Sequence, residues 1–418
     1  LCPGSILNSI NRYRQAEEKL PPRINDYGNK FPRCFNSIKP VKRLKYLLPS
    51  KAVGADRHRV SSVPIQARER MSAHTMKIAI DDGSTNVKVS WIEQGTLKTI
   101  VSPNSFRKDW KSAALLKGQK VFNYTIGTTK YTYDATSDKA LSTTHIEYQY
   151  DDLNLLSVHH ALLQTGMTPC PVHIVVTLPI TEYYNPDDCQ KNESKIEAKR
   201  RNLMRDISLS KGELFQIVDV DVMPESLPAA LSHLLNANCN EFTKSLVIDC
   251  GGTTLDMGVV VGEFDDVSAI YGNNEIGVSM VTDAARKALA AADSDSSYLV
   301  ANELIKRRHD MAFVQSVVND EAKIPGILTK IETKIRELGD QVAYEAKKFA
   351  KNPNRVYLVG GGASLIADAI RSAYTTLGDR VVLLDNPQSA LSREICLYHA
   401  DEAAHAVSSP VLLEVGDE

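Results

Sequence analysis

The sequence predicts an α/β protein built from two related domains that face each other across a cleft. One pattern occurs twice, at 77–91 and again at 245–261: an apolar strand, a turn that begins Asp-x-Gly, and a second apolar strand. Helical segments follow each of these strand pairs, which is the order of elements in an α/β domain. With 418 residues, of which 43% are hydrophobic and 24% charged, the chain can form two cores.

The first domain is predicted to begin at Met76, where a stretch with little periodicity changes abruptly into alternating apolar residues. Strands predominate at first, and helices then alternate with strands. The expected elements are strands at 77–80, 86–91 and 172–177, a hairpin at 120–134, and helices at 153–164 and 193–205.

The second domain is predicted to repeat this course. Its strand pair gives way to helices with apolar spacing, and a last apolar strand then runs into three glycines. The expected elements are strands at 245–249, 257–261 and 356–359, and helices at 278–291, 297–308 and 327–351.

The first 75 residues differ from the rest of the chain in charge. Fifteen Lys and Arg stand against five Asp and Glu before Met76, so this segment carries a net charge of about +10 and the remainder about −12. We expect a basic extension that is disordered or translated from upstream of a true start at Met71 or Met76. The alternatives are that this segment is a fragment, or that it is a targeting or nucleic-acid-binding arm.

The sequence lacks the patterns typical of a membrane span, a secretory signal or a cysteine–histidine metal site. No run of about 18 apolar residues occurs, and the N-terminus lacks the apolar core of a secretory signal. The seven cysteines are scattered and never spaced C-x-x-C, which favours reduced thiols. His159 and His160 lie in an apolar helical stretch without other ligands at metal spacing, so we expect them to be structural. These features favour a cytoplasmic protein.

The first turn, DDGSTNVK at 81–88, has the chemistry of a phosphate site. Gly83 lets the backbone approach an anion, and the next two residues offer hydroxyl and amide donors. Lys88 can reach a phosphate oxygen, and a carboxylate at the end of the strand can hold hydrated Mg²⁺. Taken alone, the pattern also fits an ordinary hairpin turn, because Asp-Gly is the commonest dipeptide there.

The second turn, DCGGTTLD at 249–256, repeats the first. It again follows an apolar strand, with a carboxylate two residues before a glycine and hydroxyls directly after. Unrelated turns have no reason to share Asp, Gly and Thr in the same register, so the repeat argues against the ordinary-turn interpretation. Placed opposite each other, the two turns would hold a polyphosphate from both sides.

Two further motifs fit the same hypothesis. The glycines at 360–362 lie between a strand and a helix, where a missing side chain allows a flat ring to approach. The helix around Glu303 and Lys306 offers polar groups for a nucleoside, although the two are also spaced as a surface i,i+3 pair. Glu225, at a strand end, could orient an attacking water or simply complement the start of a helix.

In their order along the chain, the four motifs resemble the phosphate-1, connect-1, phosphate-2 and adenosine motifs of the actin, heat-shock chaperone and sugar-kinase superfamily. From Met76 to about Val407 the chain is similar to the plasmid-partition actins, the ParM or StbA family, in segments such as IDDGSTNVKVSW, SPNSF, TLPITEYY, VMPESLPAA and IDCGGTTLD. The resemblance implies two actin-like (ribonuclease H-like) domains around a nucleotide cleft. Domain I would span 76–241 joined by 381–407, domain II would span 242–380, and 1–75 and the tail 408–418 have no counterpart.

Carried over position by position, the resemblance implies a magnesium nucleotide site. Asp81 and Asp249 would hold Mg²⁺ through water, and Glu225 would position the hydrolytic water. The ligand would be ATP, with GTP left open. The residues implied in nucleotide contact are Asp82, Gly83, Ser84, Thr85, Asn86 and Lys88 of the first turn, Gly251, Gly252, Thr253 and Thr254 of the second, and Glu303, Lys306, Gly360, Gly361 and Gly362 around the nucleoside.

The resemblance further implies an ATPase that assembles head to tail into dynamic filaments and segregates plasmid copies. Contact with DNA would be indirect, through a ParR-type adaptor bound to a centromere-like site, which agrees with the acidic balance of residues 76–418. A small-molecule kinase of the same fold is the alternative. A chaperone is disfavoured, because too few residues follow the glycine turn for a peptide-binding domain.

Overall fold

A computed structural model describes residues 75–112, 120–135, 137 and 139–408. The predicted basic extension and almost all of the tail 408–418 lie outside the described residues. The first domain is built on a five-stranded sheet in the order β3-β2-β1-β7-β9, in which β1, β2 and β3 pair antiparallel and β7 lies parallel to β1 and β9. Its strands are Met76–Asp82 (β1), Asn86–Glu93 (β2), Thr96–Pro103 (β3), Pro171–Leu178 (β7) and Gln216–Pro224 (β9).

The second domain has a sheet of the same design. Its order is β12-β11-β10-β13-β14, with two antiparallel pairs followed by two parallel pairs. The strands are Lys244–Cys250 (β10), Leu255–Val261 (β11), Asp266–Asn273 (β12), Arg355–Val359 (β13) and Val381–Leu383 (β14). Each strand of the first sheet therefore has a counterpart in the second, and the predicted pair of related α/β domains is confirmed.

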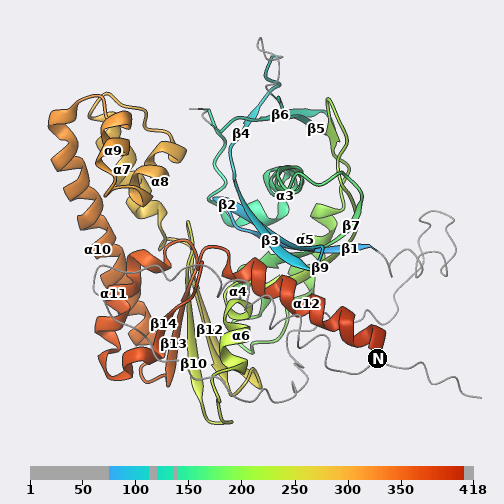
Figure 1. The fold of residues 1–418 in the computed structure, drawn as a ribbon, viewed down its shortest axis with the longest axis vertical. Helices are drawn as coiled ribbons and strands as arrows, with labels where there is room; N and C mark the ends of the chain where they lie inside the picture. Colours follow the sequence, from blue (N-terminus) through green and yellow to red (C-terminus); the bar gives the residue numbers. More distant parts are fainter. Residues whose placement is uncertain (1–74, 113–119, 136, 138, 409–418) are drawn as a thin grey trace, which may run out of the picture.

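Helices cover both sheets (Figure 1). Every helix expected from the sequence is present, with ends that differ by a few residues. The α-helices are Asp152–Gln164 (α3), Ile180–Tyr183 (α4), Glu193–Leu203 (α5), Leu231–Leu235 (α6), Ser279–Ala290 (α7), Tyr298–Lys306 (α8), Met311–Val317 (α9), Ile324–Phe349 (α10), Ala363–Ala373 (α11) and Ala390–Ser408 (α12). The 3₁₀ turns are Ile146–Tyr150 (η1), Leu227–Ala230 (η2), Glu321–Lys323 (η3) and Thr375–Arg380 (η4). Among the described residues, no helix combines the length and apolarity needed to cross a bilayer.

The 26-residue helix α10 illustrates why these segments are helical. Its buried residues recur every three or four positions and so form one apolar stripe, which packs into the second core. The buried residues are Ile324, Ile327, Ile331, Ile335, Leu338, Gly339, Val342 and Ala346. In Figure 1, α10 and α11 lie together on one side of the second sheet.

Helix α12 carries the chain back from the second domain to the first. Ser392 Oγ lies 2.9 Å from Ser90 Oγ of β2, and Glu394 accepts a hydrogen bond of 3.1 Å from the backbone N of Ser232. The crossing was predicted from residue 381, but Val381–Leu383 pairs with β13 and so belongs to the second sheet. The return to the first domain is thus made by α12.

A small third sheet curves over α3 on the side away from the first sheet (Figure 1). Its strands, in the order β4-β6-β5-β8, are Phe106–Lys108 (β4), Asn123–Ile126 (β5), Thr129–Tyr133 (β6) and Ser208–Leu209 (β8). His160 of α3 accepts or donates a 2.8 Å hydrogen bond with the Tyr124 hydroxyl and stacks on Tyr133 with ring centroids 3.8 Å apart. The histidine thus packs as a structural residue in the core, as predicted.

The buried histidines of α3 predict a loss of stability in mild acid. Burial lowers the pKa of His159 to about 4 and that of His160 to about 3. Because these values lie below that of a free histidine, about 6.5, the unfolded chain takes up protons first as the pH falls. Each histidine should therefore remove about 1.4 kcal/mol of unfolding free energy per pH unit below pH 6.5, until its folded pKa is reached.

Replacing His159 by leucine tests this expectation, because its Nδ1 has no hydrogen-bond partner in the part of the chain that the structure describes. In urea titrations between pH 6 and 4.5, His159→Leu should reduce the pH slope of the unfolding free energy by about 1.4 kcal/mol per unit. His309→Gln is the control, since that side chain is 78% exposed. An unchanged slope in His159→Leu would show that His159 does not titrate as a buried group.

Candidate functional site

The two Asp-x-Gly turns, one from each domain, lie against each other. Ser84 Oγ and Thr253 Oγ1 are 2.8 Å apart and share a hydrogen bond between residues 169 positions apart. The backbone at Gly252 has no room for a side chain, because a Cβ atom there would lie 2.5 Å from the side chain of Thr85. The expectation that the turns meet is therefore confirmed at the level of atomic contacts.

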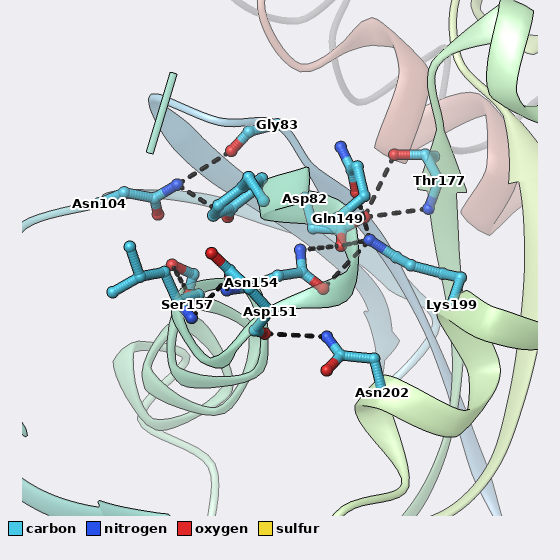
Figure 2. A network of polar contacts seen from close by, with 12 residues as sticks. Asp82, Gly83, Asn104, Gln149, Asp151, Asn154, Ser157, Thr177, Lys199 and Asn202 are labelled. Atoms are coloured by element: carbon cyan, nitrogen blue, oxygen red, sulfur yellow. Dashed lines mark hydrogen bonds and ion pairs between the residues drawn. The ribbon is translucent and has the colours of Figure 1, made fainter. Parts of the chain in front are cut away.

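The carbonyl groups of the first turn are held from one side by Asn104 (Figure 2). Its side-chain Nδ2 donates to Gly83 O at 3.0 Å and to Ser84 O at 2.8 Å, and its backbone N donates to Thr85 O at 3.0 Å. In a trans peptide the C=O and the following N–H point in opposite directions. The N–H groups of Ser84 and Thr85 therefore point away from Asn104.

The carbonyl groups of the second turn are held in the same way by the start of α7. Val278 N donates to Gly251 O at 3.1 Å, and Ser279 N donates to Gly252 O at 2.7 Å. By the same geometry, the N–H groups of Gly252 and Thr253 point away from α7.

Four backbone N–H groups are left without an acceptor by this arrangement. Those of Ser84, Thr85, Gly252 and Thr253 donate no hydrogen bond to any described residue. Unpaired N–H groups on tight turns are donors for anions such as phosphate. The meeting point of the turns therefore has the donors that the phosphate interpretation requires.

Three carboxylates and a lysine lie beside these donors. Lys88 Nζ forms an ion pair with Asp81 Oδ2 at 3.0 Å, and it also attracts Asp249 and Glu225. Burial and the neighbouring carboxylates raise the pKa of Asp249 to about 8 and that of Glu225 well above its usual value. Burial opposes charge on Lys88 too, but Asp81, Asp249 and Glu225 outweigh it and raise the lysine pKa.

This electrostatic environment favours a divalent cation. Carboxylates that are crowded and buried are destabilised as anions, and a hard cation with oxygen ligands relieves that repulsion. Asp81 and Asp249 stand at the ends of the equivalent strands β1 and β10, one in each domain. The donor set therefore fits Mg²⁺ held between the domains.

Asp82 has a different position from the rest of the first turn. It is fully buried, and its oxygens accept hydrogen bonds from Asn154 Nδ2 at 2.7 Å, from Thr177 N at 3.0 Å and from Lys199 Nζ. Lys199, itself fully buried on α5, also donates to Gln149 (Figure 2). The resemblance implied nucleotide contact for Asp82, but its carboxylate faces this network and supports the turn from within the first domain.

The glycine turn at 360–362 packs directly on the second Asp-x-Gly turn. Gly360 has φ 88°, and a Cβ atom there would lie 2.1 Å from Asp249 Oδ1. Glu303 and Lys306, on α8, form an exposed ion pair of 3.0 Å, which matches the alternative interpretation of their spacing. A nucleoside role for Glu303 and Lys306 stays a prediction.

A second acidic cluster, away from the turns, does not share these properties. His173 of β7 and Asp219 and Asp221 of β9 lie close enough to bind a metal ion. Lys77 already lies 3.2 Å from Asp221, however, and Arg200 lies 3.6 Å from Asp219. These cations neutralise the cluster, so it is an ion-pair network in the structure.

A cavity of about 620 Å³ also lies away from the turns. It is lined by residues 184–193 of the α4–α5 connection and by the start of β12. Asp187, Asp188, Glu193 and Asp266 make its lining acidic, which disfavours a phosphate. Its size alone therefore does not make it the nucleotide site.

Two residues that shape the site escaped the sequence analysis. Asn104 lies in the SPNSF segment, which was singled out only for its resemblance to the family. Lys199 lies in a polar helix whose composition predicts an exposed face. Lys199 could have been recognised only by knowing that its side of the helix faces the carboxylate of Asp82 at the end of β1. That contact joins residues 117 positions apart, so no local pattern reports it.

Two family models together match most of the chain. Residues 76–236 match the family model described as plasmid segregation protein ParM, N-terminal, and residues 239–398 match that described as plasmid segregation protein ParM, C-terminal. Among curated proteins, the chaperone protein DnaK of Metamycoplasma hominis is 25% identical over 205 residues. That match covers 48% of this chain but only 33% of the chaperone, so the chain spans about a third of its length.

Solved structures of the same fold cover most of the chain. A 15-stranded ParM filament from Clostridium botulinum has a TM-score of 0.58 and 15% identity, covering 78% of this chain and 99% of that one. An archaeal actin homologue in complex with ADP has a TM-score of 0.55 and 17% identity, covering 78% of this chain and 100% of that one. At these identities the likeness establishes the fold alone.

Proposed function

We propose that this chain, which belongs to the ParM family of plasmid segregation proteins, is an ATPase. Its ATP-dependent filaments would move plasmid copies apart in the cytoplasm. The observation that carries this proposal is the set of four backbone N–H groups where the two turns meet, which donate to no residue in the part of the chain that the structure describes. Donors from both domains can bind one polyphosphate only when the domains are closed around it. Nucleotide binding would thereby set the relative position of the domains.

The site residues take the following roles in this proposal. Asp81 and Asp249 would hold Mg²⁺ through water, and the ion would neutralise charge on the phosphates. Lys88 contacts a phosphate oxygen, and Glu225 orients the attacking water and accepts its proton. The remaining contacts come from Gly83, Ser84, Thr85 and Asn86, from Gly251, Gly252, Thr253 and Thr254, and, around the nucleoside, from Gly360, Gly361, Gly362, Glu303 and Lys306.

Filaments would form by head-to-tail contact between copies of this chain. One such interface, repeated without closing, generates a polymer. A filament of a ParM protein is among the structures of the same fold, which supports this assembly. The filament would reach plasmid DNA through a ParR-type adaptor bound to a centromere-like site.

The proposal is tested by adding ATP and Mg²⁺ to the purified full chain and following light scattering. We expect scattering to rise, then to fall as nucleotide is consumed, and electron microscopy with a slowly hydrolysed ATP analogue to show filaments. ADP and ATP without Mg²⁺ are the controls. A chain that stays monomeric with ATP and Mg²⁺ but phosphorylates a small acceptor would instead be a kinase of this fold.

A further inference from the structure

The residue that follows Glu225 has an unusual backbone. Ser226 has φ 71° and ψ −72°, a conformation that residues with a side chain rarely adopt. Leu227 N donates to Glu225 O at 2.9 Å, which closes a three-residue γ-turn around Ser226. A γ-turn of this hand is rare and strained.

The strain persists because both neighbours of Ser226 are anchored, each to a different domain. Glu225 N donates to Leu178 O at 2.7 Å, at the end of β7 in the first sheet. Leu227 is fully buried and packs on Gly258 of β11 in the second sheet, where a Cβ atom would lie 2.4 Å from Leu227 Cδ2. The turn is thus held between the two domains with Glu225 next to it.

The side chain of Ser226 does not account for the turn. It is fully buried, and its hydroxyl has no hydrogen-bond partner among the residues that the structure describes. A glycine would adopt the same backbone angles at no steric cost. Neither the backbone angles nor the hydroxyl stabilises the fold, and strained residues of this kind concentrate at functional sites.

We propose that the strained turn at Ser226 is a positioning device that holds Glu225 in the orientation needed for hydrolysis. The two anchors keep Ser226 at positive φ. In that region its Cβ atom leaves a narrower range of backbone angles than a glycine would have, and this narrower range limits where the Glu225 carboxylate can lie. Glu225 interacts electrostatically with Asp81, Asp249 and Lys88, so its carboxylate lies close to the residues of the two turns. The inference rests on the proposed role of Glu225, through which Ser226 would act as a positioning residue.

The test replaces Ser226 by glycine in the full chain and measures single-turnover ATP hydrolysis, ATP affinity and melting temperature. We expect hydrolysis to slow on the order of tenfold to hundredfold, because small displacements of a reacting group have effects of this size. ATP affinity should stay within about twofold of the original, and the melting temperature should not fall, since glycine relieves strain. A destabilised protein or equal losses of affinity and rate would overturn the proposal.

Two control variants distinguish an effect of the Ser226 backbone on hydrolysis from an effect of its hydroxyl and from a general effect of introducing glycine. Ser226→Ala keeps the Cβ atom and removes the hydroxyl, so it should hydrolyse ATP at the original rate; a slow Ser226→Ala would overturn the backbone role. Asn238→Gly relaxes another residue with positive φ, 49°, at an exposed position after α6 and should leave hydrolysis unchanged.

A double-mutant cycle with Glu225→Gln decides whether Ser226 acts through Glu225. In that background Ser226→Gly should cause no further loss of hydrolysis, and a further tenfold loss would show that it acts independently. If Glu225→Gln alone hydrolyses ATP normally, the proposed function of Glu225 fails. If Glu225→Gln is slow but Ser226→Gly is not, only the positioning role of Ser226 fails.

Discussion

Replacing Glu225 by glutamine is expected to slow ATP hydrolysis by about 10²- to 10⁴-fold, the usual contribution of a positioned general base. Glutamine has nearly the same shape but cannot accept a proton from the attacking water. Burial and the charges of Asp256, Asp81 and Asp249 raise the pKa of Glu225, and a higher pKa makes the carboxylate a stronger base. The rate of phosphate release, measured at saturating ATP and Mg²⁺, checks the expectation.

Nucleotide binding and filament assembly should survive in Glu225→Gln, because the N–H donors of the two turns are unchanged. Filaments that form should then persist after the original protein has disassembled. Glu213→Gln, at an exposed position in the first domain, is the control and should behave as the original. If phosphate release is as fast in Glu225→Gln as in Glu213→Gln, Glu225 is not the base.

Replacing Lys199 by methionine is expected to lower the free energy of unfolding by about 3–5 kcal/mol, as when one partner of a buried ion pair is removed. Lys199 and Asp82 are both fully buried, and the substitution would leave the aspartate charge without its cation. Methionine fills similar space, so the loss comes from the unpaired charge. Urea titration at pH 7 measures it.

Two further variants make the expectation specific to the ion pair. Lys195→Met, one helical turn earlier on α5, removes an ion pair with Glu182 in which the lysine side chain is 45% exposed, and it should cost no more than about 1 kcal/mol. The double variant Asp82→Asn, Lys199→Met should be more stable than Lys199→Met alone, because no buried charge remains. Equal losses in Lys199→Met and Lys195→Met would contradict a buried ion pair.

Much of the fold could be predicted from local patterns. The apolar stripe of α10 and the apolar run of β1 both lie within short stretches of sequence, so the existence of these two elements follows from the sequence. The ends were less certain: the helix expected at 193–205 stops at Leu203, and β14 lies in the second sheet although residue 381 was assigned to the crossing. Pairing with a distant strand decides such boundaries, and local propensity does not report it.

Some residues of the candidate site could likewise be predicted from the sequence, and others could be recognised only in the structure. Asp81, Asp249, Glu225 and Lys88 could be proposed because their residue types and their positions at strand ends suit phosphate chemistry. Asn104 could not, because an asparagine is recognisable as a clamp only when the carbonyls of Gly83 and Ser84 lie beside it. Asp82 was grouped with the ligand contacts because the resemblance implied it, and only the structure shows that its carboxylate is fully buried.

The sequence by itself determined the duplicated strand-turn-strand pattern, the helices and the chemical character of each turn, because all of these depend on residues within about a dozen positions of one another. Only the tertiary structure decided which groups face each other. Ser84 meets Thr253 across 169 positions, Lys199 meets Asp82 across 117, and Ser90 meets Ser392 across 302. Contacts at such separations depend on how the sheets and helices pack, which no local periodicity specifies.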